Sequence, residues 1–466
     1  MRIREFVKAL IVSASVMSAC FQSVAASAAN EIEDLVNRYR QETKCGAVSV
    51  VVYENGEASC YGDADSLYQI GSMTKAFTGL AVQKLIAEGL VNEDGNISDY
   101  VPGFEARYGS ENVDITVREL LEQKSGYTNN EKDYPSATAE MSLSEWARSI
   151  SGRELKSRPG EEYAYSNVNY NLLGLIAENA SGMPYRDYME QEVLAPLGLE
   201  HTFVGMPADG KVAEGTRLGY RRAADFPLAV REASIPAGYF YSNAADMGRW
   251  IGIWTGSIDV PEELAGALAK VKGSLKEEGD YYSGWELFAD GVTGHSGGTP
   301  NYSSRVVFSE EKQLGVCVLS NLNVAATTDS LCNSIYAIAS GGEAAGLSTD
   351  IWTLFDRIFT AVTAAGVLVL LAVVVIRNRV LLVVLDAVMA LLLTLVFILF
   401  PMIFGAGMKE ILFTWAPWSL SGGLLAIAGV IAVTTGKLLL VNKHADHNET
   451  GKRQSADGHD RVPGIQ

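Results

Sequence analysis

Three long apolar segments near the C-terminus place the strongest constraint on the fold of this chain of 466 residues. They cover about residues 358–376, 380–404 and 420–440, and each is close to the roughly 20 residues that a helix needs to cross a bilayer. Three transmembrane helices are therefore predicted within residues 358–441. Asp386, inside the second segment, is a candidate functional residue, although pairing with a neighbouring charge or extension to the membrane surface is favoured.

Charged residues beside these segments predict their orientation. Arg377 and Arg379 separate the first two segments, and Lys443 and Lys452 follow the third, whereas the loop between the second and third is not enriched in positive charge. The positive-inside rule then predicts a cytoplasmic tail over residues 442–466 and an N-terminal domain outside the cell membrane.

The N-terminus points to the same orientation. Arg2, Arg4 and Lys8 precede an apolar stretch that ends in small residues at Ala26-Ser27-Ala28, the pattern of an export signal. A signal peptide is predicted over residues 1–28. An alternative that stays open is lipid attachment at Cys20, within the sequence MSAC.

The rest of the chain has the composition of a globular domain, predicted over residues 29–340 with a linker over 341–357. The whole chain is 48% hydrophobic and 20% charged, with a net charge of −18 and a sequence pI near 4.8. This charge disfavours nucleic acid and a basic face on anionic lipid as partners. The membrane bilayer is an expected partner, and protein partners are not indicated.

Strand patterns lie at both ends of this domain, and helical patterns lie between them. AVSVVVYENGEASCYG predicts a hairpin that turns at Asn55-Gly56, and SRVVFSEEKQLGVCVLSNL predicts a second strand pair. TVRELLEQKSG and YNLLGLIAENASG predict helices that end at glycine. An α+β fold is expected, with an antiparallel sheet in which the terminal strands meet, flanked by helices and with a helical insertion.

The cysteines give little information on disulfides. The predicted hairpin sets Cys60 opposite Val51, which leaves Cys45 about 20 Å away along its strand, too far for a disulfide. A bridge between Cys317 and Cys332 stays open.

The sequence GHSGG, residues 294–298, matches the G-x-S-x-G nucleophile elbow of α/β-hydrolases. An elbow needs a helix directly after its serine, yet GGTPNYSSRVVF continues with glycines, a proline and a strand-like run. It also needs a later histidine, and the next one, His444, lies beyond the last apolar segment. Ser296 is therefore not predicted to be a nucleophile.

Ser72 is a better candidate. Ser72-Met73-Thr74-Lys75 is an S-x-x-K that opens a helical pattern, so the Lys75 amine is predicted to lie beside the Ser72 hydroxyl at the helix N-terminus. Two further groups accompany it. Tyr165 and Asn167, two residues apart in a predicted loop, would face the same side, and His295-Ser296-Gly297-Gly298 lies on or beside a strand.

These motifs in this order resemble the serine β-lactamase and penicillin-binding protein superfamily, in particular its class C β-lactamase-like branch. The similarity covers about residues 48–322 and includes RPGEEYAYSN, APLGLEHTF and IPAGYFYSNAADMGRW. It does not cover the apolar segments.

The resemblance implies a role for each motif residue. Ser72 would form an acyl-enzyme, with Lys75 and Tyr165 sharing the task of taking its proton and the choice between them open. The phenol would need neighbouring cations, which Lys75 and His295 could supply. Asn167 would orient Lys75 and the substrate amide.

The third motif would bind substrate. The backbone N–H groups of Ser72 and Gly298 would form an oxyanion hole, and His295, Ser296 and Gly297 would line the substrate cleft. His295 departs from the lysine common in β-lactam-hydrolysing relatives. As a conditional cation with an ordinary pKa near 6.5, it would hold a carboxylate less well as pH rises.

The resemblance and the predicted tether favour an extracytoplasmic serine hydrolase of the DD-peptidase type, acting on D-amino-acid-containing peptides of the cell-wall kind. An esterase or amidase, or a class C-type β-lactamase, remains an alternative on the same fold. A sensor that is acylated once is another, and a scaffold without activity a third. No cofactor is indicated, and the spacing of His and Cys indicates no metal site.

Overall fold

The computed structural model describes residues 27–130, 132–278, 280–288 and 290–457, with side chains to residue 440. Cys20 therefore lies outside the described residues, as does all of the predicted signal peptide except its last two residues. The chain divides into two compact units. The first comprises the residues up to Arg217 and Ala223–Ile351, and the second comprises Leu218–Arg222 and the residues from Trp352 onward.

The first unit is built on a seven-stranded antiparallel sheet, with strand order β10-β11-β12-β13-β14-β1-β2. The strands are β1 (Val48–Glu54), β2 (Glu57–Gly62), β10 (Tyr281–Tyr282), β11 (Trp285–Leu287), β12 (Thr293–Thr299), β13 (Tyr302–Ser309) and β14 (Leu314–Ser320). The pairing of β1 with β14, from Val48 opposite Ser320 to Glu54 opposite Leu314, confirms that strands from both ends of the domain meet in one sheet.

The first hairpin forms as its sequence predicts. Asn55 and Gly56 join β1 to β2 with φ values of 50° and 92°, the left-handed geometry of a two-residue turn. The register sets Cys60 opposite Val51, as expected. Cys45, Cys60, Cys317 and Cys332 are all free thiols; Cys332 contacts the carbonyl oxygen of Val316 at 3.5 Å instead.

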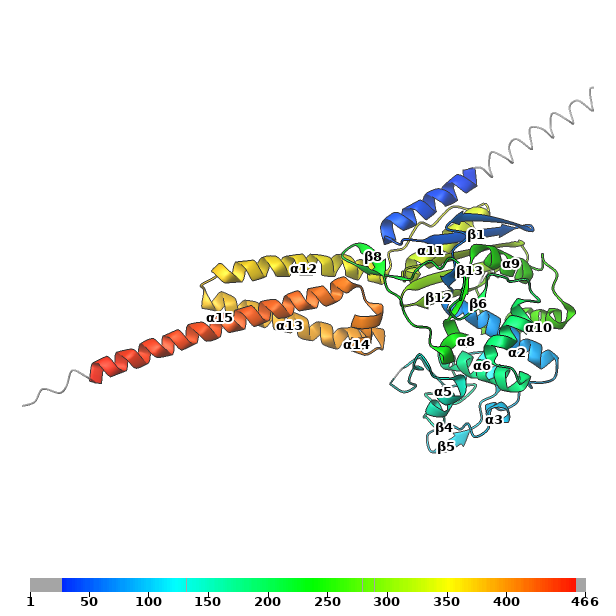
Figure 1. Ribbon diagram of the computed structural model, residues 1–466, viewed down its shortest axis with the longest axis horizontal. Helices are drawn as coiled ribbons and strands as arrows, with labels where there is room; N and C mark the ends of the chain where they lie inside the picture. The colour runs from blue at the N-terminus through cyan, green and yellow to red at the C-terminus, as the bar shows by residue number, and fades with distance from the viewer. Residues whose placement is uncertain (1–26, 131, 279, 289, 458–466) are drawn as a thin grey trace, which may run out of the picture. The chain divides into compact units, whose positions relative to one another are not determined.

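Helices cover both faces of the sheet (Figure 1). All residues of β14 are buried, because α9 (Ala244–Thr255) and α11 (Ala325–Ala339) both pack against this strand. α10 (Glu262–Glu278) packs against the end of the sheet at β10 and against α2 (Thr74–Ala87).

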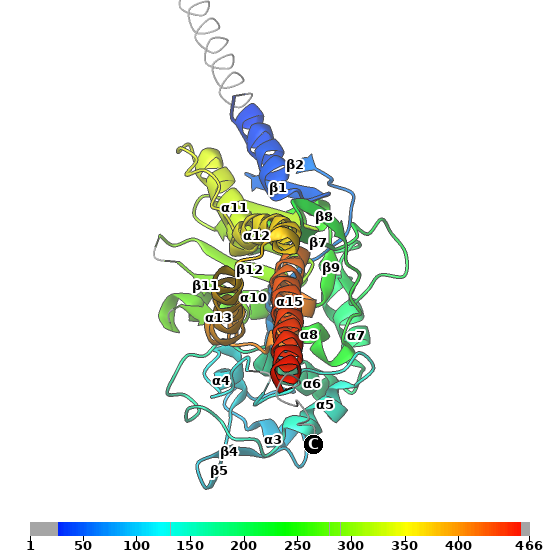
Figure 2. The same cartoon turned by 90° about the vertical axis from the view of Figure 1, so that its left-hand side faces the viewer.

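The remaining helices form a cluster around α2 and α6, with α3 to α6 gathered together in Figure 2. They are η1 (Gly71–Met73), α3 (Ile97–Tyr100), α4 (Val117–Leu121), α5 (Leu143–Ile150), α6 (Asn167–Ser181), α7 (Tyr185–Tyr188), η2 (Met189–Leu194), η3 (Glu232–Ser234) and α8 (Ile235–Gly238). Short strands complete the fold: β3 (Tyr68–Gln69), β9 (Phe240–Ser242) and β6 (Phe203–Val204) in one sheet, and the pairs β4 (Ala106–Tyr108) with β5 (Glu111–Val113) and β7 (Thr216–Gly219) with β8 (Arg222–Asp225).

α6 ends at Gly182 as predicted, with a left-handed φ of 69°, but α4 ends five residues before its glycine. The helix stops because Gln123 adopts a left-handed φ of 60°. Its backbone carbonyl accepts from the Ala164 amide at 2.8 Å, and its side-chain oxygen accepts from the Ser166 amide at 2.9 Å. The early end of α4 therefore anchors the segment that carries Tyr165.

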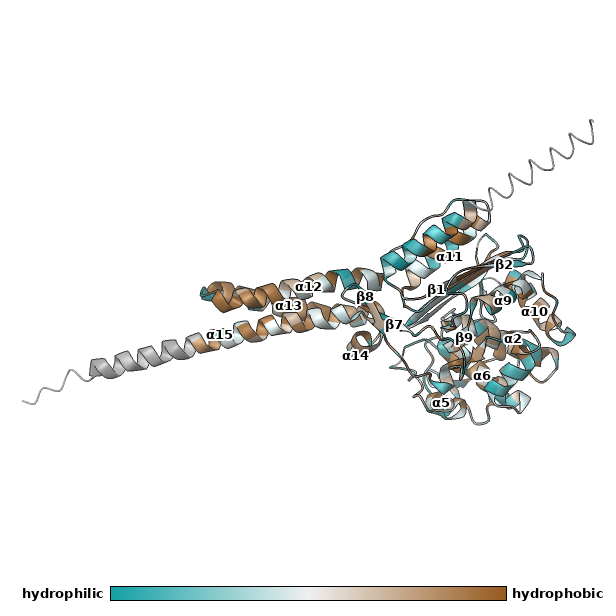
Figure 3. Ribbon diagram, turned by 45° about the horizontal axis from the view of Figure 1, so that its top comes forward, coloured by the Kyte–Doolittle hydropathy of each residue, from teal (hydrophilic) through white to brown (hydrophobic). Residues whose placement is uncertain are grey.

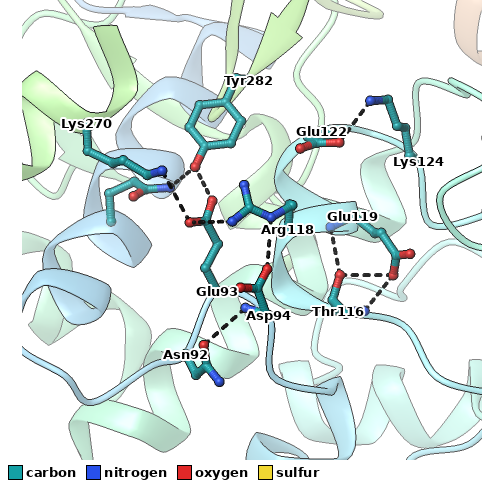
Figure 4. Close-up of polar contacts among 11 residues, drawn as sticks. Asn92, Glu93, Asp94, Thr116, Arg118, Glu119, Glu122, Lys124, Lys270 and Tyr282 are labelled. Carbon is teal, nitrogen blue, oxygen red and sulfur yellow. Dashed lines mark hydrogen bonds and ion pairs between the residues drawn. The ribbon is translucent and has the colours of Figure 1, made fainter. Parts of the chain in front are cut away.

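A buried carboxylate, Glu93, connects the helices to the end of the sheet (Figure 4). It pairs with Arg118 at 3.2 Å and with Lys270 at 3.6 Å, and it accepts a hydrogen bond from the Tyr282 hydroxyl on β10. Gln83 on α2 donates to the same hydroxyl at 2.8 Å. This network holds β10 against the helices.

Glu93→Ala is expected to lower the free energy of unfolding by about 2–3 kcal/mol, because it removes the acceptor of the buried Tyr282 hydroxyl and the ion pairs with Arg118 and Lys270. Thermal unfolding of the purified full chain in detergent would measure the effect. Glu111→Gln, which removes an exposed ion pair with Arg158, serves as the control and should not change the unfolding temperature. Equal unfolding temperatures for the two variants would contradict the bracing role of Glu93.

The second unit contains three helices that are long and apolar enough to cross a membrane. They are α12 (Ile351–Val375), α13 (Arg379–Phe404) and the first part, to Leu440, of α15 (Trp418–Asp457), and Figure 3 shows hydrophobic residues along them. α14 (Met408–Glu410) and η4 (Ile411–Trp415) connect the last two. α12 begins seven residues before the predicted apolar segment, since Asp356 in its first turns is buried and accepts from the Ser419 hydroxyl at 2.7 Å.

Asp386 on α13 forms hydrogen bonds with hydroxyl groups, where the sequence predicted an ion pair or an extension to the membrane surface. Its carboxylate accepts hydrogen bonds from the hydroxyls of Thr434, at 2.5 Å, and Thr435, at 3.2 Å, on α15. It therefore joins two helices through hydroxyl groups, without an ion pair to Arg379. Lys437 on α15 donates to the carbonyl oxygens of Val373 and Val374, which satisfies the last turn of α12.

Candidate active site

Ser72 lies in the single turn η1, directly before α2. α2 is buried on every side, so this turn is fixed by the core of the first unit. Lys75 is one helical turn further on and is fully buried, whereas Ser72 is partly exposed. The Ser72 hydroxyl is therefore accessible to a substrate, whereas the Lys75 amine is shielded from solvent.

The Lys75 amine has three close oxygen atoms. Its Nζ lies 2.9 Å from Ser72 Oγ, 2.7 Å from Asn167 Oδ1 and 2.7 Å from the carbonyl oxygen of Ala237. Burial lowers the pKa of Lys75 well below its ordinary value. A neutral amine has two N–H donors and one lone pair. With the two donors directed to Asn167 and Ala237, which can only accept here, the lone pair faces the Ser72 hydroxyl.

Tyr165 and Asn167 are brought to the same place by the start of α6. Asn167 is the first residue of the helix, and Ser166 is its N-cap; the predicted loop is thus a helix terminus. The Tyr165 ring lies 4.9 Å from Lys75 Nζ. Burial raises the pKa of Tyr165 above its ordinary value, and a hydrogen bond with Ser72 acts in the opposite direction. The phenol therefore keeps its proton at neutral pH.

His295 is buried on β12, with its ring centroid 6.0 Å from that of Tyr165. Its Nδ1 lies 2.6 Å from the carbonyl oxygen of Ser296, which can only accept, so Nδ1 carries the proton. Nε2 is then free to accept from the Tyr281 hydroxyl at 3.4 Å. Burial, followed by the charges of Lys75 and Arg305, lowers the pKa of His295 to about 3. Burial therefore moves the protonation of His295 well below the pH near 6.5 at which the sequence predicted that it becomes a cation.

Protonation of His295 is expected to lower the free energy of unfolding of the first unit as pH decreases from about 6.5 toward 3. The folded pKa of about 3 lies below the ordinary 6.5, so the unfolded chain binds the extra proton in this window and is favoured as pH falls. The contribution reaches about 1.4 kcal/mol per pH unit. Unfolding of the full chain at a series of pH values should give a smaller slope for His295→Gln than for the wild type, and equal slopes would show that His295 does not titrate in this way.

Glycines bring β12 into contact with the turn that holds Ser72. A Cβ atom on Gly71 would lie 2.5 Å from the backbone nitrogen of Gly298, and one on Gly297 would overlap the carbonyl oxygen of Ile70. Gly71 also has a φ of 52°, which favours glycine. This close approach brings the backbone at Gly298 against the turn that carries Ser72, and the oxyanion hole expected from their two N–H groups stays a prediction.

The Ser296 side chain does not point toward Ser72, contrary to the expectation that it lines the cleft. Neighbouring residues of a strand face opposite sides of the sheet, and His295 takes the side of Tyr165. The Ser296 hydroxyl instead donates to Asp329 Oδ1 on α11 at 3.0 Å and accepts from Arg305 on β13 at 2.6 Å.

Three contributors to the site were missed in the sequence. Ala237 contributes only its backbone carbonyl, which any residue type has. Gln123 lies outside every recognised motif, although its side chain holds the segment that carries Tyr165. No residue pattern therefore reveals either one. Tyr281 contacts His295 and packs edge-on against Tyr165 at 6.1 Å. In the sequence, Tyr281 is marked only by the aromatic pair in YYSG. Aromatic pairs are also common in buried strands without a functional role, so this pattern does not indicate a site.

The sheet, the buried central helix and this arrangement of Ser, Lys and Tyr define the class of the β-lactamases and penicillin-binding proteins. The family model described as Beta-lactamase matches residues 32–339. The chain belongs to this family.

Relatives and solved structures agree on the fold. Protein flp of Staphylococcus aureus (strain MRSA252) is 31% identical over 315 residues, so the chain spans 63% of the length of that relative. The octameric penicillin-binding protein homologue from Pyrococcus abyssi aligns with a TM-score of 0.59 at 21% identity, over 71% of this chain and 81% of that one. The Beta-Lactamase/D-Alanine Carboxypeptidase from Pseudomonas syringae aligns with a TM-score of 0.57 at 18% identity, over 68% and 99%.

Proposed function

We propose that this protein is a membrane-anchored serine hydrolase that acts through an acyl-enzyme on peptides containing D-amino acids. The observation that carries the proposal is the position of Lys75 Nζ, 2.9 Å from Ser72 Oγ, with both of its N–H donors directed to other acceptors. Because its two N–H groups are engaged, the Lys75 amine can accept a proton only from the Ser72 hydroxyl.

In the acylation step, Ser72 Oγ attacks the substrate carbonyl carbon while its proton passes to Lys75 Nζ. The carbonyl oxygen becomes negative between the N–H groups of Ser72 and Gly298, which stabilise it. The tetrahedral intermediate then collapses, the bond to the leaving group breaks, and the leaving group receives a proton. Tyr165, protonated and beside both Ser72 and Lys75, can relay this proton.

In the deacylation step, water attacks the ester carbon and displaces Ser72 Oγ. The same groups serve again in reverse order: a base accepts the water proton, and Ser72 recovers its own. Because the amine and phenol lie side by side, the proton exchanged in each step stays within the site.

The substrate class rests on the family. The structurally similar Pseudomonas syringae protein is described as a β-lactamase and D-alanine carboxypeptidase. The bilayer-length helices of the second unit support a membrane location. With the charges that flank these helices, they support a multi-pass chain whose catalytic domain lies outside the cytoplasm, where wall peptides occur.

The test uses the full chain purified in detergent, incubated with penicillin and with acetyl-D-alanyl-D-alanine esters and amides. Intact mass is expected to rise by one acyl group, digestion to locate that group on the peptide containing Ser72, and the D-configured substrates to be turned over. The L-diastereomers are the matched control and should be cleaved much more slowly. A stoichiometric adduct without turnover would favour the sensor, and an adduct elsewhere or none at all would refute the proposal.

A further inference from the structure

The Lys75 amine becomes positively charged when it accepts the Ser72 proton, and it has no acidic partner. Its hydrogen-bond partners are the Ser72 hydroxyl, Asn167 Oδ1 and the Ala237 carbonyl oxygen, all of them uncharged. Among the described residues, no carboxylate forms a hydrogen bond or an ion pair with Lys75, and burial alone lowers its pKa. The buried charge that forms during acylation therefore needs another kind of stabilisation.

The other elements around Lys75 supply no negative charge either. His295 on β12 is neutral, and a charged Lys75 disfavours its protonation. Tyr165 keeps its proton because burial raises its pKa. α8, which packs against α2, carries no charged side chain over Ile235–Gly238. η2 and α10 also pack against α2, but no charge on either of them influences the pKa of Lys75.

Two aromatic rings lie where a carboxylate would otherwise be needed. Lys75 Nζ is over the Tyr165 ring, 4.9 Å from its centroid, and over the Tyr170 ring, 5.7 Å from its centroid. The face of an aromatic ring carries partial negative charge and attracts a cation within about 6 Å. The attraction is stronger where water is excluded, and Lys75 and Tyr170 are both fully buried.

The fold holds the Tyr170 ring in this position. Tyr170 lies three residues after Asn167 on α6, so both side chains are on the same side of the helix and both reach Lys75. The Tyr170 hydroxyl donates to the carbonyl oxygen of Leu121, at the end of α4, at 3.3 Å. The Tyr281 ring packs edge-on against it, with 6.5 Å between the ring centroids. These contacts keep the face of the ring toward the amine.

We propose that Tyr170 is a positioning residue that stabilises the protonated form of Lys75 through the face of its ring, and thereby strengthens the base that takes the Ser72 proton. The inference rests on the proposed function, in which Lys75 is that base. It assigns a role to an aromatic ring that lies outside the three sequence motifs.

The test changes the charge of the ring face and keeps the shape of the ring. In the full chain in detergent, position 170 carries either phenylalanine, by Tyr170→Phe, or trifluorophenylalanine, whose fluorine atoms withdraw negative charge from the ring face. The probe is a small alkyl fluorophosphonate. Ser72 Oγ forms a bond to phosphorus, the P–F bond breaks, fluoride leaves, and the hydroxyl proton passes to Lys75. Intact mass measures the rate of adduct formation at a series of pH values.

Labelling should become faster as pH rises and Lys75 loses its proton, and Tyr170→Phe should keep the midpoint of this rise close to that of the wild type. The trifluorinated ring should move the midpoint about 0.5–1 pH unit lower, because the ammonium form is less stable. It should also lower the plateau rate, because a weaker base accepts the proton less readily.

Tyr188 on α7 is the matched control. Its buried ring lies 5.9 Å from the Nζ atom of Lys84, which is on the same helix as Lys75. Phenylalanine and trifluorophenylalanine at position 188 should give the same midpoint and the same plateau rate.

The outcomes separate the two proposals. Equal midpoints for the two rings at position 170, or an equally large shift at position 188, would overturn the role of Tyr170 and leave Ser72 and Lys75 in place. A shift at position 170 alone, in a chain that cleaves no D-configured peptide, would support this role and refute only the proposed substrate. If no adduct formed on Ser72 in any chain, both the proposed function and this inference would be refuted.

Discussion

Ser72→Ala is expected to abolish turnover of any substrate that the wild-type chain hydrolyses, with kcat lowered by at least about 10⁴-fold. The reason is geometric: Ser72 carries the hydroxyl that Lys75 Nζ contacts, and alanine leaves no atom to attack the substrate carbonyl. The backbone N–H of residue 72 remains, so the oxyanion hole and substrate binding should persist. Steady-state kinetics together with the intact mass after incubation would measure both effects.

The matched control is Ser144→Ala, which removes the hydroxyl of an exposed serine in α5 and should change neither rate nor labelling. An acyl adduct that still forms on the Ser72→Ala chain, or a kcat within about tenfold of the wild type, would remove Ser72 from the mechanism.

Lys75→Met is expected to lower kcat by about 10³-fold, the loss typical of removing a general base. Methionine has a similar length and no charge, so it suits this fully buried position, and the fold should survive. Because burial lowers the pKa of Lys75, the wild-type rate should rise with pH as the amine loses its proton, and this limb should be missing from the variant. The pH profile of kcat/KM measures the difference.

Lys84→Met is the control on the same helix. Lys84 pairs with Glu88 at 2.6 Å and with Glu192 at 3.1 Å and has no contact with Ser72 among the described residues. It should retain the rate and the pH profile of the wild type. A Lys75→Met chain that keeps the wild-type pH limb would instead assign the base to Tyr165, the alternative that the sequence left open.

Much of the fold could be predicted from local patterns. The hairpin at Asn55-Gly56 and its register follow from turn chemistry, because only a few residue pairs accept a left-handed turn. The pairing of β1 with β14 follows from the order of elements, since a strand edge needs a partner. The early end of α4 could not be predicted, because Gln123 leaves the helix to bind a segment about 40 residues further along the chain, and helix propensity does not include such contacts.

The sequence predicted which side chains lie together near Ser72 better than it predicted their electrostatics. The helical spacing of Ser72 and Lys75 fixes their contact, as an interval of three residues on a helix must. The state of His295 was not predictable, because its pKa depends on burial and on the nearby charges of Lys75 and Arg305, neither of which a motif records. The direction of the Ser296 side chain needed the strand register, which places Arg305 opposite it.

The contact of Gly71 with Gly297 and Gly298 has a consequence for how such an enzyme changes over time. It fixes the reaction centre through main-chain atoms, which no exchange of side chains on neighbouring strands can displace. Side chains on the neighbouring elements can therefore change while the backbone contact beside Ser72 stays in place. Gly71 and Gly297 are therefore the positions that cannot vary, because a side chain at either one would collide with the backbone of the other segment.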